Sequence, residues 1–283
     1  MAVDLHTHST FSDGTDEPAA LVRLALEAGL SALALTDHDT LDGIGEARAA
    51  AAGTPLELVP GVELSVDWEI GPAHLLAYWV EPGAGPLPAR LAEIQAGRAR
   101  RNTEILAALA ALGMHLSPDE LRNTPGLVGR PHIAAALVRE GHVASLQDAF
   151  ALYLAQGRPA YRPRLRLTAA EAVDLTRRSG GLAVLAHPHT VAVASEDYAA
   201  ALAAFRDLGG AGVECHYPDY PAELQEHLSS FTRRLGMIPT GGSDYHGALR
   251  PGLALGTGRG DLAVPDRAAE ELRRAAGRAQ PFR

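Results

Sequence analysis

Residues 2–14 of the chain, AVDLHTHSTFSDG, combine a short apolar strand with three side chains that bind metal ions well. AVDLH has the length and composition of a first β-strand, and polar residues follow it directly. Alternate side chains of a strand face the same side, so His6 and His8 can bind one ion together. Asp13 adds a carboxylate after a short loop. The stretch therefore predicts a strand that ends at a metal site.

The same succession of strand, polar strand end and helix recurs along the chain. Residues 18–29 have the apolar periodicity of an amphipathic helix, with Pro18 at its start and Gly29 at its end. Alternating strands and helices indicate the α/β class, with parallel strands joined by crossover helices. The predicted strands are 2–6, 30–39, 56–65, 73–80, 181–189, 210–218 and 237–247. The predicted helices of this α/β part are 18–29, 41–53, 168–180, 198–209, 221–236 and 266–279.

A helical insertion interrupts this alternation. Its predicted helices are 88–113, 117–124, 131–141 and 145–157, and the Pro/Arg-rich stretch 158–166 closes it. We therefore expect a first barrel segment over 1–92, a helical insertion over 93–164 that acts as a lid or substrate subdomain, and a second barrel segment over 165–283.

The composition limits the class of protein. The 283 residues carry a formal net charge of −9, with 47% hydrophobic and 21% charged residues, as in ordinary globular proteins. Such an acidic chain is a poor binder of long duplex nucleic acid, whose backbone attracts basic surfaces. All basic residues are Arg, which excludes a Lys nucleophile, and Cys215 is the single cysteine, which excludes an intrachain disulfide. Because the sequence contains neither a recognisable signal peptide nor a long apolar run, we expect a cytoplasmic protein without membrane contact.

Residues that can bind metals recur where the predicted strands end. In folds built on parallel strands, the carboxyl ends of the strands form one rim, where residues distant in sequence meet. His74 lies inside a predicted strand and needs a polar partner if it is buried. Imidazole and carboxylate ligands suit Zn, Mn and Fe, and Glu63 is the candidate to bridge two ions. The polar strand ends are HTH (6–8), TDHD (36–39), GVELS (61–65), AHPH (186–189), ECH (214–216) and SDYH (243–246).

Other polar residues have simpler interpretations. Asp37 could be a turn residue, and Asp39 and Asp42 are expected to cap a helix that begins near Leu41. Three isolated histidines are expected at the surface or on helices, namely His115, His142 and His227.

HTHSTFSDG (6–14), TDHDT (36–40), GVELS, AHPH and SDYH resemble the motifs of the PHP (polymerase and histidinol phosphatase) family, over essentially the whole chain. Within the family, the chain resembles stand-alone bacterial phosphoesterases that act on nucleotides, including nucleoside 3′,5′-bisphosphate phosphatases and 5′-end exoribonucleases. GRPHIAAALVREGHV (129–143) and RPAYRP (158–163) are similar to that subgroup. The resemblance implies a distorted (β/α)7 barrel of the TIM type with an inserted helical subdomain.

The resemblance also implies a centre of three divalent metal ions, which could be Mn, Fe or Zn. One ion would be held by His6, His8, Glu63 and Asp244. Glu63 would bridge to a second ion, completed by His74 and His187. The third ion would be held by Asp13, His38 and His246. Relatives often carry Gly where this chain has His189, which could lie near the substrate, transfer a proton or be a neutral change.

For such a centre we expect a hydroxide that bridges two metal ions to attack phosphorus in line with the leaving oxygen. Arg130 and His132, in the phrase GRPH, and His216 at a strand end are the predicted substrate contacts, because an Arg fork matches phosphate oxygens. His216 or His189 could donate the proton to the leaving group. Weaker candidates for substrate contact are Arg158, Arg162 and Tyr161.

The predicted function is hydrolysis of nucleotide phosphate monoesters, with a nucleotide or a short oligonucleotide as the substrate. The alternatives are a 5′-3′ exonuclease on short RNA or DNA, a histidinol-phosphatase-like enzyme, and a non-enzymatic metal-binding regulatory module. Neither the native metal nor the oligomeric state follows from the sequence.

Overall fold

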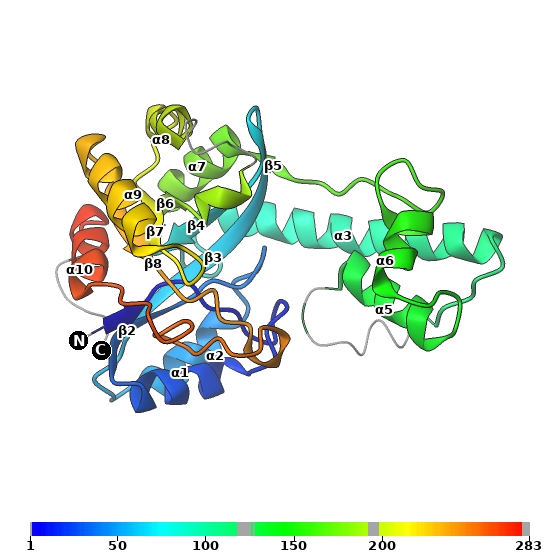
Figure 1. Ribbon diagram of the computed structural model, residues 1–283, viewed down its shortest axis with the longest axis horizontal. Helices are drawn as coiled ribbons and strands as arrows, with labels where there is room; N and C mark the ends of the chain where they lie inside the picture. The colour runs from blue at the N-terminus through cyan, green and yellow to red at the C-terminus, as the bar shows by residue number, and fades with distance from the viewer. Residues whose placement is uncertain (1, 118–125, 127, 192–197, 279–283) are drawn as a thin grey trace. The chain divides into compact units, whose positions relative to one another are not determined.

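A computed structural model describes residues 2–117, 126, 128–191 and 198–278 of the chain. Its contacts divide the chain into two compact units (Figure 1). The larger unit combines Met1–Leu91 with Arg166–Arg283, and the smaller unit is Ala92–Leu165. The insertion predicted from the sequence, 93–164, differs from the smaller unit by one residue at each end.

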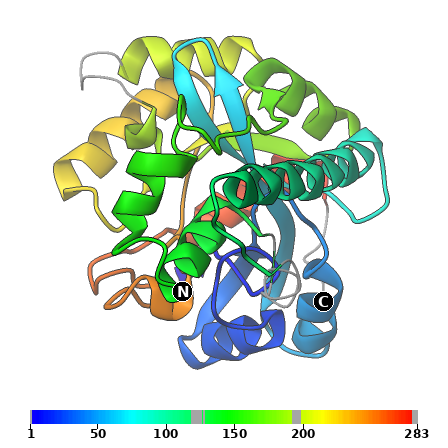
Figure 2. The ribbon, with the colours of Figure 1, turned by 90° about the vertical axis from the view of Figure 1, so that its right-hand side faces the viewer.

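In the described part of the larger unit, eight strands form one sheet (Figures 1 and 2). The order of the strands is β1-β2-β3-β4-β6-β7-β8, and β5 pairs with β3. Their bounds are β1 (Ala2–Asp4), β2 (Leu30–Leu35), β3 (Glu57–Trp68), β4 (Gly71–Tyr78), β5 (Leu167–Thr168), β6 (Leu182–Leu185), β7 (Gly212–His216) and β8 (Ile238–Gly241). Within the set β1-β2-β3 and within the set β6-β7-β8, adjacent strands run parallel, as the sequence predicts.

Strand β4 runs antiparallel to both of its neighbours, β3 and β6. The prediction of parallel strands is therefore wrong for β4. The reason is the connection: only Glu69 and Ile70 separate β3 from β4, whereas a parallel crossover needs about a dozen residues or more. The resulting hairpin places His74 opposite Ser65 in the ladder of hydrogen bonds.

Backbone hydrogen bonds join the segments that follow β1 and β8. The amide of His8 donates to the carbonyl of Tyr245 at 2.9 Å, and the amide of Asp244 donates to the carbonyl of His6 at 2.9 Å. Two segments with predicted metal ligands are thus bonded to each other. The α/β class is confirmed, and a closed (β/α)7 barrel stays a prediction of the resemblance.

Helices of the larger unit cover its sheet, and α1 and α2 pack side by side (Figure 1). The first of them begins on Pro18, and Gly29, with φ of 70°, follows its end, as the sequence predicts. The bounds are α1 (Pro18–Glu27), α2 (Ile44–Ala51), α7 (Ala169–Arg178), α8 (Tyr198–Asp207), α9 (Ala222–Arg234) and α10 (Asp266–Ala275).

The start of α2 differs from the prediction. The residue before the helix is Gly43, and no side chain caps the first turn. The prediction that Asp39 and Asp42 cap this helix is therefore wrong. Asp39 has a positive φ of 53°, and its Oδ1 accepts a hydrogen bond from the amide of Ser65 at 3.2 Å. Its carboxylate therefore fastens the β2–α2 loop to β3.

The core of the larger unit is mainly aliphatic, as the low aromatic content predicts. Burying one Val or Leu side chain contributes about 1.5–3 kcal/mol, so such a core stabilises the sheet strongly. Tyr78 is fully buried, and its hydroxyl donates to the carbonyl of Leu5 at 2.7 Å. This bond ties β4 to the segment that carries His6. Members of the core include Val3, Leu5, Ala34, Val59, Leu76, Tyr78, Trp79, Val184, Val264 and Leu272.

The smaller unit is helical in its described residues. Its helices are α3 (Pro86–Ala111, which begins in the larger unit), α5 (Arg130–Arg139), α6 (Leu146–Ala149) and the π-helical turn η1 (Phe150–Leu154). The prediction of one helix over 145–157 is wrong, because α6 passes into the π-helical turn after four residues. The helix predicted over 117–124 lies outside the described residues apart from Ser117. The unit has its own apolar core, formed by residues such as Ile105, Leu109, Ile133, Leu137 and Leu154.

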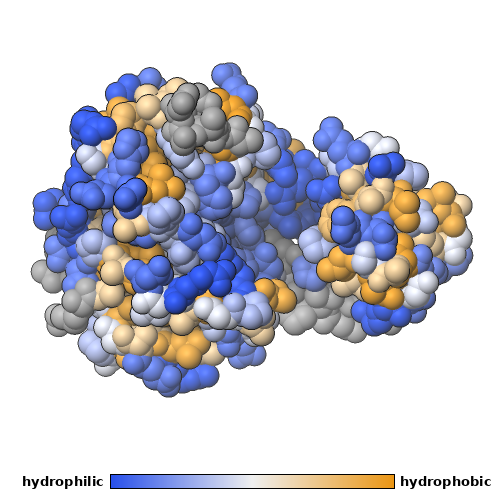
Figure 3. Space-filling model, viewed as in Figure 1, coloured by the Kyte–Doolittle hydropathy of each residue, from blue (hydrophilic) through white to orange (hydrophobic). Residues whose placement is uncertain are grey.

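Apolar residues also reach the surface of the smaller unit (Figure 3). The large apolar side chains exposed there, among the described residues, are Leu112, Leu146, Leu152 and Leu165. Single exposed leucines are common on soluble proteins and do not by themselves define a binding surface. None of the helices in the described ranges is both long and apolar enough to cross a membrane.

Candidate metal centre

His6 and His8 lie directly after β1 and converge on one point. Neither side chain is exposed to solvent, and their Nε2 atoms are 3.0 Å apart. This convergence follows from their spacing, which puts both rings on one face of an extended chain. Two imidazole nitrogens directed at one point are suited to hold one cation.

Glu63, in the middle of β3, brings a buried carboxylate to these two imidazoles. Its Oε2 lies 3.2 Å from Nε2 of His6 and 3.1 Å from Nε2 of His8. The same oxygen lies 3.1 Å from Nδ1 of His38. Asp244, which follows β8, places its Oδ1 3.4 Å from Nε2 of His6 and 3.2 Å from Nε2 of His8. One carboxylate from β3 and one from the segment after β8 therefore face the same pair of imidazoles.

The other oxygen of Glu63 faces different imidazoles. Its Oε1 lies 2.8 Å from Nδ1 of His74 and 3.0 Å from Nε2 of His187. His74, the polar interruption of β4, thus has a carboxylate partner. The two oxygens of Glu63 face two separate sets of nitrogen atoms, which is the arrangement that a ligand bridging two ions requires.

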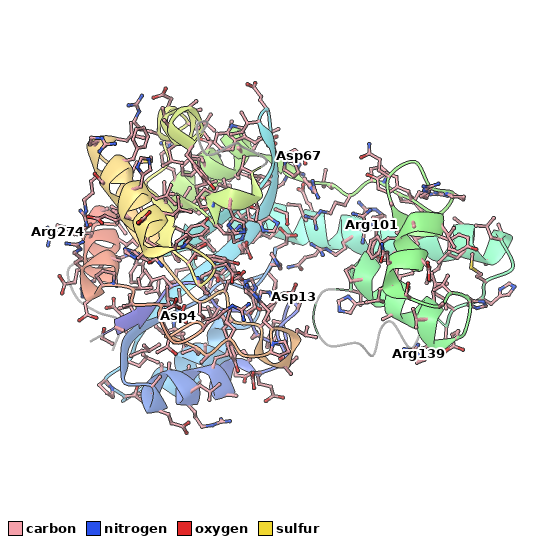
Figure 4. The ribbon with its side chains drawn as sticks, viewed as in Figure 1. Asp4, Asp13, Asp67, Arg101, Arg139 and Arg274 are labelled. Carbon is pink, nitrogen blue, oxygen red and sulfur yellow. The ribbon has the colours of Figure 1, made fainter. Side chains whose placement is uncertain are left out.

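Asp13 extends the cluster on the side of the loop after β1 (Figure 4). Its Oδ1 lies 3.3 Å from Nε2 of His246, and its Oδ2 lies 3.7 Å from Nε2 of His38. Burial raises the pKa of Asp13, but the hydrogen bond with His246 and the charges of His38 and His8 outweigh burial and lower the pKa well below its usual range. Asp13 is therefore held as a carboxylate, the form that binds metals.

The described residues include three groups whose ligand atoms lie within 4.8 Å of one another. The first group is His6, His8, Glu63 and Asp244. The second group is His8, Asp13, His38 and His246. The third group is His38, Glu63 and His74. All nine predicted ligands thus lie together, with His187 beside Glu63, and three of them, His8, His38 and Glu63, each belong to two groups.

Three ligand atoms of these groups are buried without a well-formed hydrogen bond among the described residues, namely Nδ1 of His38, Nδ1 of His74 and Oδ1 of Asp13. Each lies close to another ligand of the cluster, at 3.1 Å and 2.8 Å from Glu63 for the two imidazoles and at 3.3 Å from His246 for Asp13. Bound cations would complete the coordination of these atoms. Imidazoles combined with carboxylates are ligands that Zn, Mn and Fe accept.

The pKa shifts show that the cluster requires positive charge. Burial lowers the pKa of His8, but hydrogen bonds with Asp244 and Glu63 outweigh it and raise the pKa to about 10. Burial also raises the pKa of Glu63, but the charges of His38 and other imidazoles lower it well below its usual range. For His38 burial prevails and lowers the pKa to about 4. Protons or divalent ions can supply the positive charge that these carboxylates demand.

Glu214, on β7, is a functional residue that the sequence analysis missed. It is fully buried; its Oε1 lies 2.9 Å from Nδ1 of His6, and its Oε2 accepts from the amide of His187 at 2.7 Å. The strand end ECH predicts a site residue at His216, but Nδ1 of His216 lies 3.1 Å from Oε1 of Gln225 on α9. A register shift between Glu214 and His216 explains why the two residues face different sides. The sequence feature that could have identified Glu214 is a carboxylate inside an otherwise apolar strand.

Two further buried carboxylates hold the loops that carry the ligands. Asp37 accepts hydrogen bonds from the amide and hydroxyl of Ser9 at 2.7 and 2.6 Å and from the hydroxyl of Ser12 at 2.6 Å. It is therefore more than a turn residue, because it fixes the loop between His8 and Asp13. Asp4, labelled in Figure 4, accepts from the amide of Ser243 at 2.9 Å and fixes the loop after β8.

The predicted substrate residues of the smaller unit make local contacts. Nη1 of Arg130 donates to the carbonyl of Leu154 at 3.0 Å, and its guanidinium lies 5.4 Å from the ring centroid of Tyr161. Nδ1 of His132 accepts from the amide of Gly129 at 3.0 Å, at the start of α5. Both residues therefore have structural roles within their unit.

Comparisons with known proteins agree with this site. Residues 4–168 match the PHP domain family. A 3′,5′-nucleoside bisphosphate phosphatase of Chromobacterium violaceum is 31% identical over 257 residues, which cover 90% of each chain. The 5′-3′ exoribonuclease Rnm of Salmonella typhimurium is 34% identical over 248 residues, 86% of this chain and 84% of that one. A crystal structure from Bifidobacterium adolescentis, whose description names a metal-dependent phosphoesterase, superposes with a TM-score of 0.77 at 31% identity, covering 96% of this chain and 95% of the other.

An α/β fold with His, Asp and Glu clusters at its strand ends, together with these relatives, defines a hydrolase of the metal-dependent phosphoesterase class. The chain belongs to the PHP family.

Proposed function

We propose that the protein hydrolyses phosphate monoesters of nucleotides, such as nucleoside 3′,5′-bisphosphates or nucleoside monophosphates. The carboxylate of Glu63 carries the proposal, because its two oxygens face two sets of imidazoles as a bridging ligand does. The name of the Chromobacterium violaceum relative, a nucleoside bisphosphate phosphatase, supports the choice of substrate.

Nine side chains would hold three divalent ions, which could be Mn, Fe or Zn. The three groups of ligand atoms support this number, with His187 completing the group of Glu63 and His74. When bound, the ions would supply an activated water and positive charge for the phosphoryl oxygens. The ligands would be His6, His8, Asp13, His38, Glu63, His74, His187, Asp244 and His246.

Arg130 and His132 are the proposed contacts to the phosphate of the substrate. Burial and the charges of Arg98, Arg130 and Arg164 lower the pKa of Arg101, on α3, to about 10 (Figure 4). The positive charges of these guanidinium groups therefore repel one another. A phosphate anion would reduce this repulsion and could accept two hydrogen bonds from one guanidinium. Arg130 is the first candidate and His132, on the same helix, the second. The weaker candidates remain Arg158, Arg162 and Tyr161.

His189 would protonate the leaving group. Its ring lies 5.9 Å from that of His187, between centroids, and the side chain is exposed. The hydroxyl of Tyr220 accepts from the amide of His189 at 3.2 Å and lies 2.9 Å from Nδ1 of its ring, which orients the imidazole. As the imidazolium, the ring would give its Nε2 proton to the leaving oxygen and remain as neutral imidazole. His216 is the weaker choice, because its ring contacts α9.

The test is a phosphate-release assay with metal-free protein reconstituted separately with Mn, Fe and Zn. We expect release from a nucleoside 3′,5′-bisphosphate with at least one metal and loss of that release in Asp244→Asn. The panel of phosphoesters also includes histidinol phosphate. If the fully reconstituted protein released phosphate from none of them, the protein would be a non-enzymatic metal-binding module and not a phosphatase.

A 5′-3′ exonuclease acting on short oligonucleotides is the second candidate, supported by the exoribonuclease relative. The net charge of −9 favours short substrates over long duplexes. A 5′-labelled oligonucleotide distinguishes the two activities, because an exonuclease releases mononucleotides whereas a phosphomonoesterase releases only inorganic phosphate. We also expect the enzyme in the cytoplasm, which cell fractionation tests.

A further inference from the structure

Asp244 adopts an unusual backbone conformation at the point where it faces the metal centre. Its φ is 52°, in the left-handed region that favours glycine. Holding a residue other than glycine there costs of order 1–3 kcal/mol, and the surroundings must supply this energy. The conformation directs Oδ1 toward the imidazoles of His6 and His8, at 3.4 and 3.2 Å from their Nε2 atoms.

Arg250 contacts both the main chain and the side chain of this residue. Its Nη1 donates to Oδ2 of Asp244 at 2.7 Å and to the carbonyl of Asp244 at 3.1 Å. Its Nη2 donates to Oδ2 of Asp219 at 3.2 Å. One guanidinium therefore clamps Asp244 and is itself anchored to the loop after β7.

Tyr217 forms a second hydrogen bond with the Asp244 oxygen that Arg250 contacts, Oδ2. Its hydroxyl donates to Oδ2 of Asp244 at 2.8 Å, and Nη1 of Arg250 donates to that hydroxyl at 3.1 Å. Oδ2 thus accepts two hydrogen bonds from the protein, while Oδ1 faces His6 and His8. A carboxylate arranged in this way presents one oxygen to an ion.

We propose that Arg250 is a positioning residue of the metal centre, which holds Asp244 in its left-handed conformation and makes it a one-oxygen ligand. The inference rests on the proposed function of the centre as a metal site. The guanidinium has two opposed effects: it fixes the geometry of the ligand, which strengthens metal binding, and it places a permanent positive charge beside the ions, which weakens binding. In our proposal the geometric effect prevails.

Variants at position 250 separate the two effects. Arg250→Lys keeps the charge but lacks the planar fork whose Nη1 reaches Asp244 while its Nη2 reaches Asp219. Arg250→Gln removes the charge as well. A positioning role predicts that both substitutions weaken Mn²⁺ binding, whereas a purely electrostatic role predicts that Arg250→Gln strengthens it. Arg259→Gln is the matched control, because Nε of Arg259 contacts Asp219 at 3.1 Å without reaching Asp244.

The experiment measures Mn²⁺ affinity by calorimetry and the metal content by mass spectrometry, with metal-free protein whose folding is verified by circular dichroism. We expect Arg250→Lys and Arg250→Gln to weaken the tightest site by about tenfold or more. Tyr217→Phe, which removes only one hydroxyl, should weaken it less, and Arg259→Gln should bind as the wild type does. If a position-250 variant fails to fold, Tyr217→Phe still tests the engagement of Oδ2.

A double-substitution cycle distinguishes positioning from a general loosening of the loop. If Arg250 acts through Asp244, then Arg250→Gln in the Asp244→Asn background changes the affinity less than twofold. The same tenfold loss in both backgrounds, or wild-type affinity in both position-250 variants, overturns the inference and leaves the proposed function standing. Wild-type protein that binds no Mn²⁺, Fe²⁺ or Zn²⁺ overturns both.

Discussion

The carboxylate of Glu214 lies 2.9 Å from Nδ1 of His6, and neither side chain is exposed to solvent. A carboxylate that accepts the proton of one ring nitrogen fixes the orientation of the imidazole and leaves the other nitrogen free of a proton. Nε2 of His6, which faces Glu63 and Asp244, would then be the atom that binds an ion. A residue outside the ligand set determines how a ligand is presented.

We expect Glu214→Gln to weaken Mn²⁺ binding by about 10–100-fold, because outer carboxylates of this kind typically contribute that much to metal affinity. The amide can still contact the ring, but it no longer supplies a negative charge. Calorimetric titration of the metal-free protein measures the change. Glu226→Gln, at an exposed position of α9, should bind as the wild type does. Equal affinities for Glu214→Gln and wild type would contradict this role.

Single substitutions at His6 and Asp13 should remove different ions. His6 belongs only to the group with Glu63 and Asp244, and Asp13 only to the group with His246 and His38, whereas His8 belongs to both groups. Mass spectrometry of His6→Ala and Asp13→Ala should show fewer ions per chain in each, and the double variant should lose more than either. A double variant with the metal content of a single variant would show that both residues serve one ion.

Gly242 allows close packing against His6. An added Cβ at position 242 would lie 2.4 Å from the Cβ and the backbone nitrogen of His6. We expect Gly242→Ala to displace this ligand, lowering both the melting temperature and the metal content. Gly45→Ala, inside α2, is the control, since nothing lies within 4 Å of its added Cβ. The control should stabilise the protein by up to about 1 kcal/mol, because alanine favours a helix.

The single cysteine should be inert in the folded protein. Burial raises the pKa of the Cys215 thiol to about 12, so very little thiolate exists at pH 8. A thiol reagent should label the native protein slowly and the urea-unfolded protein at once. Fast labelling of the native state at pH 8 would show that β7 opens readily.

The candidate ligands could be found from the sequence because most of them follow a local rule, and the structure brings them together. Strand ends gather at one edge of a parallel sheet, so short motifs such as HTH and SDYH mark candidate ligands without knowledge of the packing. That these residues bind ions stays a prediction. The direction of β4 was missed although Gly71 and Pro72, directly after Glu69 and Ile70, are a turn signal that indicates a short connection. Glu214 was missed because a register shift changes which side chain of β7 faces inward.

Residues that hold the ligands were harder to find than the ligands themselves. Arg250 reaches Asp219 and Tyr217, which lie about thirty residues earlier in the sequence, through contacts between two loops. Nothing in the spacing of GALR (247–250) indicates such a clamp. Side-chain contacts between loops depend on the folded arrangement of the sheet, whereas periodicity reports only on single elements.

The candidate ligands of the metal centre lie on two kinds of backbone, the antiparallel β3–β4 hairpin and the loops after β1 and β8. Glu63 and His74 belong to a continuous hydrogen-bonded ladder, which opens only when a large part of the sheet unfolds. Asp13 and His246 lie on the loops after β1 and β8, which side-chain hydrogen bonds to Asp37 and Asp4 hold in place of a ladder. We therefore expect an ion held by Asp13 and His246 to dissociate faster than an ion held by Glu63 and His74. A chelator should strip the centre in a fast and a slow phase, which makes the hairpin the element that retains the last ion.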